Sequence, residues 1–238
     1  MTLKRSAEGL VKGPKIKMLL RLFTALILTS IIFLVLYFQN SWIFASVIFL
    51  VCLTAYYEWI SNKFKKKLFG FFLIFNFGFW SIFLIFGWEA YFGNNLNSPP
   101  VLMAYFLFGI IIFITAIFDI FAYIIGSNFG KTFIVREISP NKTLEGLIGG
   151  LFPLISIGIL MVLSLTPMPF LLAIAIILFF ILVGLSAFAG DLLISYFKRQ
   201  SGIKDTGTIL PGHGGVLDRI DSHLIATPFW IIILFFMA

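Results

Sequence analysis

The sequence predicts an all-α protein, a polytopic integral membrane bundle of about seven transmembrane helices, on three observations. Of its 238 residues, 61% are hydrophobic and only 11% are charged, whereas soluble domains contain roughly 45–50% apolar residues. The mean hydropathy is +1.08. Seven apolar segments follow one another along the chain, and a helix needs about 20 apolar residues to cross a membrane. These features exclude an ordinary soluble domain.

The apolar segments are separated by polar, glycine-containing or proline-containing connections, and a basic tail, residues 1–17, precedes them. The predicted spans cover residues 18–38, 42–60, 69–88, 101–125, 146–165, 168–189 and 224–238. The last span would rise only about 22 Å as a helix, against a hydrocarbon core of about 30 Å. It therefore needs a locally thinned membrane or an earlier start.

Lysine and arginine occupy alternate connections of this predicted topology. All 17 fall within residues 1–21, 61–68, 126–145 and 198–223. Cytoplasmic loops retain these residues and translocated loops avoid them, so we expect a cytoplasmic N-terminus and an external C-terminus. The net charge of +7 then reflects membrane orientation, and we expect no nucleic-acid partner.

Polar residues are concentrated in residues 190–222, between segments that are almost wholly apolar. Carboxylates and basic side chains together suit nucleotidyl or phosphoryl transfer, because one or two carboxylates plus substrate phosphates hold Mg²⁺. Two such ions can clamp the attacking and leaving oxygens, and cations neutralise the departing triphosphate. The charged candidates are Asp191, Asp205, Asp218, Asp221, Lys198, Arg199, Lys204 and Arg219. A solvated loop whose charges simply pair is the alternative.

Helical spacing groups some of these residues. If the helix that carries Asp191 continues, Ser195 lies four residues on and shares its face. Lys198 and Arg199 follow at +7 and +8. The glycine-flanked His213 lies in a loop whose backbone can approach a ligand closely; it could orient a phosphate, bond the backbone, or merely be tolerated.

A second set of polar residues lies at the end of the fourth predicted span and in the loop after it. Asp119 and Tyr123 are four residues apart and share a helix face. A carboxylate inside a span is costly unless it meets water, a cation or a donor, so Asp119 is a functional candidate; the alternative is a structural interhelical hydrogen bond. In SPNKTLEG, Ser139 or Thr143 can cap the next helix, and Lys142 projects toward an anion at that positive helix end.

From Ser195 to Asp221 the chain reads SYFKRQSGIKDTGTILPGHGGVLDRID, with a serine, a Lys-Arg pair, a Lys-Asp pair, HGG and DRxD in order. With the upstream DIFAYIIGSNFGK and SPNKTLEG, this pattern resembles the bacterial phosphatidate cytidylyltransferases, also called CDP-diglyceride synthetases. The resemblance spans about residues 119–236, and AYYEWI around Glu58 is similar to a short motif of the family. It departs at Ile194, where many members have a glutamate.

The resemblance implies an enzyme in which a phosphatidate oxygen attacks the α-phosphate of CTP. Pyrophosphate leaves and CDP-diacylglycerol forms, for phospholipid synthesis. It implies one transmembrane catalytic domain over residues 18–238, with N-terminal helices over 18–100 and the CTP- and metal-binding part over 101–238. The protein would be multi-pass in the cell inner (plasma) membrane among membrane lipids, with its active site on the cytoplasmic side, and would form a homodimer.

The resemblance also implies roles for individual positions. A two-metal site would hold Mg²⁺, with a second ion that is divalent or monovalent, at Asp191, Asp218 and Asp221. Lys204 and Asp205 would join these three as catalytic residues. The substrate-binding positions would be Asp119, Tyr123, Lys142, Ser195, Lys198, Arg199, His213, Gly214, Gly215 and Arg219.

Two other functions are compatible with some of these residues. A CTP-dependent kinase acting on a lipid alcohol resembles this family in its CTP-binding region, but it transfers the γ-phosphate. A transporter or channel would line an ion pathway with Asp119 and Asp191. Transport predicts polar residues through the whole membrane depth, whereas this sequence gathers them on one predicted side.

Overall fold

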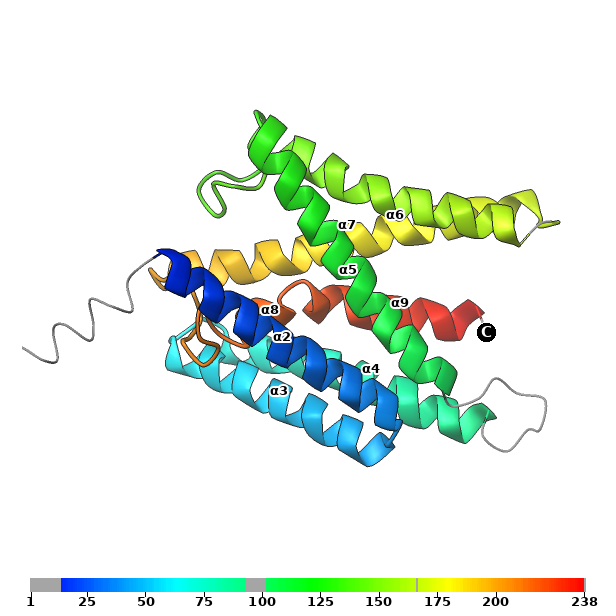
Figure 1. Cartoon of the computed structure of the whole chain (residues 1–238), viewed down its shortest axis with the longest axis horizontal. Helices are drawn as coiled ribbons and strands as arrows, with labels where there is room; N and C mark the ends of the chain where they lie inside the picture. The colour runs from blue at the N-terminus through cyan, green and yellow to red at the C-terminus, as the bar shows by residue number, and fades with distance from the viewer. Residues whose placement is uncertain (1–13, 93–101, 166, 238) are drawn as a thin grey trace, which may run out of the picture.

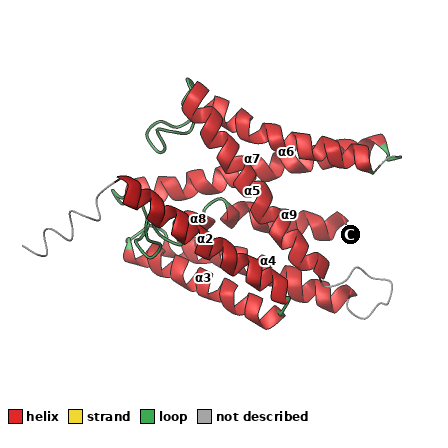
Figure 2. Ribbon diagram, in the orientation of Figure 1, coloured by secondary structure: helices red, strands yellow, loops and turns green. Residues whose placement is uncertain are grey.

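A computed structural model of the chain describes residues 14–92, 102–165 and 167–237. Figures 1 and 2 show that these residues form helices joined by loops, and the described part contains no β-strand. The helices are α2 (Pro14–Phe38), α3 (Ser41–Ser61), α4 (Lys67–Phe92), α5 (Leu102–Phe129), α6 (Leu144–Ser164), α7 (Phe170–Gln200), α8 (Leu217–Ile220) and α9 (His223–Met237). The predicted all-α fold is confirmed.

Six helices, α2 to α7, are long and apolar enough to cross a membrane, and they coincide with the first six predicted spans. The last helix, α9, has only 15 residues. It begins near the middle of the bundle's long dimension and runs to the end where the C-terminus is marked (Figure 1). The multi-pass membrane fold is therefore supported, while the count of seven spans stays a prediction.

Two predicted boundaries differ from the structure. Helix α7 continues to Gln200, well past the predicted end at residue 189, because the polar residues of its last turns face other protein segments. Helix α2 begins at Pro14, inside the predicted tail; proline suits the first helical position, where no intrahelical partner for its missing N–H is needed. The rest of that tail, residues 1–13, lies outside the described residues.

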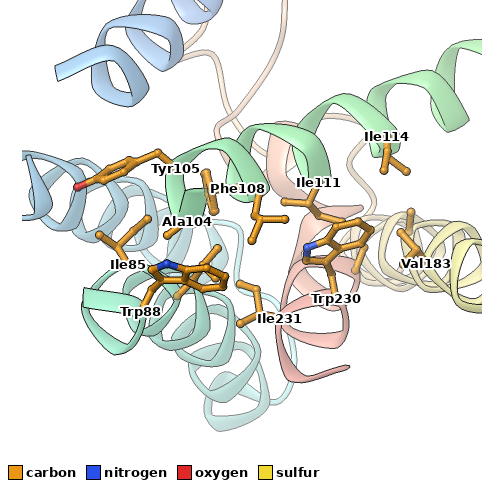
Figure 3. Close-up of a cluster of buried hydrophobic side chains, with 14 of the residues drawn as sticks. Ile85, Trp88, Ala104, Tyr105, Phe108, Ile111, Ile114, Val183, Trp230 and Ile231 are labelled. Atoms are coloured by element: carbon orange, nitrogen blue, oxygen red, sulfur yellow. The ribbon is translucent and has the colours of Figure 1, made fainter. Parts of the chain in front are cut away.

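The core lies where α5 crosses α4, α7 and α9. Figure 3 shows Ile111 and Ile114 of α5 with Val183 of α7, next to Trp230 and Ile231 of α9. None of these five side chains is more than 5% exposed. Lipid tails are as apolar as these side chains, so close packing is what favours their association. Helix α9 is therefore an internal element of the bundle.

Close backbone approach brings the polar segments together at two glycines. On α6, a Cβ at Gly146 would lie 2.8 Å from the carbonyl oxygen of Ala122 on α5. On α7, a Cβ at Gly190 would overlap the carbonyl oxygen of Asp221 and lie 3.1 Å from that of Ser222. Small residues allow such contacts between membrane helices, and they place α5, α6, α7 and the α8–α9 junction around one space.

Gly190→Ala should lower the melting temperature of the protein in detergent. Its methyl group meets a backbone carbonyl that cannot turn aside, and overpacking of this kind costs about 1–3 kcal/mol, more than the gain of about 1 kcal/mol from alanine's helix propensity. The control is Gly109→Ala, whose Cβ would meet only a Leu36 methyl at 3.2 Å. Equal melting temperatures for the two variants would contradict the assigned packing.

Candidate active site

A polar cavity of about 380 Å³ lies between α5, α6, α7 and the segment around α8. The chain segments that supply its polar wall are far apart in sequence and meet near the bundle end that carries the α5–α6 and α7–α8 loops (Figure 1). The polar lining residues are Asp119, Tyr123, Ser139, Asn141, Lys142, Thr143, Asp191, Lys198, Asp205, Asp218, Arg219, Asp221 and Ser222. The two predicted polar groups thus form one site.

The loop before α6 is held by the start of that helix. Thr143 is the N-cap, and its hydroxyl oxygen accepts a hydrogen bond from the Gly146 amide at 3.1 Å, as the capping prediction required. The Glu145 carboxylate accepts hydrogen bonds at 3.1 Å from the amides of Lys131 and Thr132. These bonds fix the backbone on both sides of Lys142.

Lys142 reaches across the cavity to α7. Its Nζ atom lies 2.8 Å from Oδ2 of Asp191 and 4.7 Å from the ring centroid of Phe188, which adds a cation–π contact. The other oxygen of Asp191, Oδ1, accepts a hydrogen bond from the Ser195 hydroxyl at 3.3 Å. The shared helix face predicted for Asp191 and Ser195 is therefore present, although Ser195 itself does not line the cavity.

A buried ion pair forms the floor of the site. Nζ of Lys198 lies 2.8 Å from Oδ1 of Asp218, and the two side chains are only 11% and 4% exposed. Oδ2 of Asp218 accepts hydrogen bonds from the amides of Thr206 at 2.7 Å and Gly215 at 3.0 Å. Burial raises the pKa of Asp218, but the hydrogen bond and charge of Lys198 and these amides outweigh it, so the pKa is lowered. Asp218 is therefore ionised and firmly held.

The remaining carboxylates of the cavity face one another. The Ser222 hydroxyl donates to Oδ2 of Asp119 at 3.2 Å, and the Ser222 amide donates to Oδ1 of Asp221 at 2.9 Å. Burial raises the pKa of Asp221 well above its usual value, and the charge of Asp191 raises it further. Asp221 therefore holds its proton more tightly than an exposed aspartate does.

Some predicted residues lie outside the cavity. Arg199 donates from Nε to the carbonyl oxygen of Ile138 at 3.0 Å and from Nη1 to that of Ile203 at 3.1 Å, so it ties the two loops together. Lys204 is exposed. Neither residue is among those that line the cavity, and their proposed roles toward substrate or catalysis stay predictions.

The HGG loop packs on α2 instead of lining the cavity. His213 hydrogen-bonds through Nδ1 to the Thr24 hydroxyl, and Nε of Arg21 donates to the carbonyl oxygen of Gly212 at 3.1 Å. Burial and the charges of Arg219 and Arg21 lower the pKa of His213. The histidine is therefore a neutral contact between this loop and the first helix of the bundle.

The two glycines that follow His213 lie against the carboxylate of Asp218. Gly214 has a φ of 86°, in the left-handed region, and a Cβ there would lie 2.9 Å from Oδ2 of Asp218. Gly215 donates its amide to that same oxygen. The Gly215 amide thus holds a carboxylate of the protein itself, while the Gly214 amide bonds the carbonyl oxygen of Leu210; the approach of this loop to a substrate stays a prediction.

Sequence reasoning missed three polar residues of the site, and it noted a fourth, Glu58, only through a short motif. Asn141 and Ser222 line the cavity, and Thr206 supports Asp218 from a buried position. Glu58 is 1% exposed and hydrogen-bonds the α7–α8 segment from α3. A usable signal existed for Glu58, because a carboxylate in an apolar segment must find donors. The small polar residues had no such signal.

The three predicted metal ligands fit a cation unequally. Asp191 and Asp221 line the cavity, and the charge of Asp191 raises the pKa of Asp221, which a bound cation would offset. Asp191 is itself occupied, by Lys142 at one oxygen and by Ser195 at the other. Both oxygens of Asp218 are already occupied, one by Lys198 and the other by backbone amides. In the described part of the chain, no three His, Cys, Asp or Glu side chains are close enough together to hold a metal ion. The magnesium site at Asp191, Asp218 and Asp221 stays a prediction, and a metal there would have to displace Lys142 and Lys198 from these carboxylates.

The fold and the cavity define a class of protein: an integral membrane helix bundle with a charge-lined polar cavity built from its loops and helix ends. The family follows from comparison with known proteins. The model described as "Cytidylyltransferase family" matches residues 100–237, which include every residue that lines the cavity. The chain belongs to this family.

Individual relatives agree with the family assignment. A phosphatidate cytidylyltransferase from Aquifex aeolicus is 34% identical over 206 residues, which cover 87% of this chain and 71% of the relative. One from Bacillus subtilis is 45% identical over 111 residues, 45% of this chain and 39% of the relative. An uncharacterized Escherichia coli protein, YnbB, is 44% identical over 110 residues, 46% of this chain and 36% of that protein. The chain thus spans well under half of these last two relatives.

Lys198→Met should strongly destabilise the protein. It leaves the Asp218 carboxylate buried without its cation, and breaking a buried pair in this way costs about 3–5 kcal/mol. The measurement is the melting temperature in detergent, with the exposed Lys204→Met as the matched control, for which we expect a change within about 0.5 kcal/mol. Equal melting temperatures for the two variants would show that the Lys198–Asp218 pair contributes little.

Proposed function

We propose that the protein transfers a cytidylyl group from CTP to phosphatidate, which yields CDP-diacylglycerol and pyrophosphate. The observation that carries the proposal is the cavity, where Lys142, Lys198 and Arg219 stand among carboxylates within the part of the chain that matches the cytidylyltransferase family. The Aquifex aeolicus and Bacillus subtilis relatives bear the name of this activity.

In this reaction a phosphate oxygen of phosphatidate bonds to the α-phosphorus of CTP, and the bond between the α-phosphorus and the oxygen bridging to the β-phosphate breaks. The electron pair leaves with pyrophosphate. Lys142, from the loop before α6, and Arg219, from α8, both line the cavity and would bind and orient the phosphates. Lys198 keeps Asp218 ionised, and its positive charge would be available to the leaving pyrophosphate if Asp218 turned from it to a metal ion.

Magnesium is part of the proposal. Asp191 and Asp221 would hold it together with substrate phosphates, and Asp218 would join them by giving up its contact with Lys198. Bound there, the ion would neutralise phosphate charge and favour departure of pyrophosphate. A second ion, divalent or monovalent, would complete the two-metal site that the resemblance implies.

The site would lie on the cytoplasmic face of the plasma membrane, where CTP is available. The α3–α4, α5–α6 and α7–α8 connections, which carry the lysines and arginines, lie at one end of the bundle, and the α2–α3 turn lies at the other (Figure 1). The positive-inside rule then orients that basic end toward the cytoplasm. A homodimer is also implied by the resemblance, and its mass in detergent would test it.

The decisive experiment incubates the purified full chain with phosphatidate, Mg²⁺ and CTP labelled in turn at the α- and γ-phosphates. Label from the α-position should enter the lipid, and pyrophosphate should be released. Label that enters from the γ-position would instead identify a lipid kinase. Absence of transfer from either position would overturn both enzyme assignments.

Asp191→Asn and Asp221→Asn should each lower kcat by at least about 100-fold while the protein stays folded, because each removes negative charge that Mg²⁺ needs at nearly constant shape. The required Mg²⁺ concentration should rise with the loss of either carboxylate. The matched control is Glu137→Gln in the α5–α6 loop, an exposed residue outside the cavity. A wild-type Mg²⁺ dependence in both aspartate variants would contradict the ligand assignment.

A further inference from the structure

Glu58 lies near the end of α3, outside residues 100–237, which match the family. Its side chain is 1% exposed, and its carboxylate is hydrogen-bonded to other groups of the protein. Oε1 accepts a hydrogen bond from the Val216 amide at 2.9 Å, and Oε2 accepts one from the Leu217 amide at 2.9 Å and one from the Thr206 hydroxyl at 2.8 Å. Burying a carboxylate is costly without such donors, so these three hydrogen bonds are what allow Glu58 to be buried.

All three partners of Glu58 belong to the segment that carries Asp218. Thr206 lies after Lys204 and Asp205 in the α7–α8 loop, and Val216 and Leu217 open the short helix on which Asp218 stands. The carboxylate therefore joins the two ends of this loop at one point. Other contacts also hold the loop, among them those of His213 with α2 and of Asn62 with Thr206, but Glu58 bonds both ends of the loop at once from α3.

Thr206 links Glu58 directly to the cavity. Its hydroxyl lies 2.8 Å from Oε2 of Glu58 and 3.1 Å from Oδ2 of Asp218, and its amide donates to that same Asp218 oxygen at 2.7 Å. Asp218 in turn holds Lys198. A displacement of Glu58 would thus reach both charged groups at the floor of the cavity through Thr206, in addition to its bonds to the backbone just before Asp218.

Two glycines of the α7–α8 segment leave room for the Glu58 carboxylate. A Cβ at Gly207 would lie 2.7 Å from Oε1 of Glu58, and a Cβ at Gly215 would overlap Oε2. On the same side, Asn62 at the end of α3 donates from Nδ2 to the carbonyl oxygen of Thr206. Glycines stand at both points where a side chain would separate the loop from α3.

We propose that Glu58 is a positioning residue: by holding Thr206 and the start of α8 against α3, it sets where Asp218 and Lys198 stand in the cavity. It does not touch the reacting groups. The proposal rests on the cytidylyl transfer proposed above only for its kinetic readout, because the closure of the loop can be measured without any reaction.

The test compares Glu58→Ala and Glu58→Gln in the full-length protein. Alanine removes all three acceptor contacts, whereas glutamine keeps one acceptor oxygen and nearly the same shape. We expect kcat per folded molecule to fall about 10–100-fold for alanine and less for glutamine, with a smaller change in KM for CTP. The matched control is Glu89→Gln on α4, whose exposed carboxylate accepts a hydrogen bond from Ser41 and should leave both constants unchanged.

Limited trypsin digestion provides the readout that does not depend on activity. Lys204 is exposed in the loop that Glu58 closes, so cleavage after Lys204, identified by fragment mass, should accelerate in Glu58→Ala and less in Glu58→Gln. An unchanged cleavage rate in Glu58→Ala overturns the proposal. If the wild-type protein shows no cytidylyl transfer, the proposed function fails, and the cleavage rates still decide the role of Glu58.

A double-mutant cycle separates positioning from general loss of fold. Thr206→Val removes the hydroxyl shared by Glu58 and Asp218. If Glu58 acts through Thr206, the effects of Glu58→Ala and Thr206→Val on kcat should be clearly less than additive. Additive effects, or an activity loss that only follows the amount of folded protein, would overturn the proposal.

Discussion

A charged side chain buried in an apolar helix bundle must be met by donors or by an opposite charge, and the polar centre of this protein depends on that requirement. Asp218 is met by Lys198 and two backbone amides, Asp191 by Lys142, and Glu58 by the α7–α8 segment. Lys198 lies on α7 and Lys142 in the loop before α6, while the α7–α8 segment supplies donors to both Asp218 and Glu58. The contacts that neutralise the carboxylates are therefore the same contacts that join α3, α6, α7 and α8 into one site.

Close packing of the helices brings these charged groups within reach of their partners. Neighbouring membrane helices gain nothing from expelling water, so their approach depends on small residues at the contact. Gly146 lets α6 lie against Ala122 of α5, and Gly190 lets α7 lie against the α8–α9 junction. Because both glycines sit within a few residues of a charged group of the cavity, the packing of the bundle and the geometry of its charges are fixed at the same points.

Local spacing accounts for what the sequence could predict. An aspartate and a serine four residues apart meet on one helix face, as Asp191 and Ser195 do. At about 100° per residue, the +7 position returns to within about 20° of Asp191, while the +8 position lies about 80° away. Lys198 accordingly faces the cavity, and Arg199 turns to loop carbonyls. The contacts of Glu58 escaped prediction because its partners lie roughly 150 residues further along the chain, beyond the reach of any periodic pattern.

The short helix α9 imposes an order on assembly. It starts inside the bundle and buries Trp230 and Ile231 against α4, α5 and α7, all of which precede it in the chain. The polar α8 segment, which directly precedes α9, is held by hydrogen bonds to Glu58 of α3 and Lys198 of α7. It can therefore be buried in the bundle only after α3 and α7 have inserted. Docking of α9 therefore follows the insertion of α3, α4, α5 and α7, and the cavity forms only once the α8–α9 segment has been synthesised and has joined them.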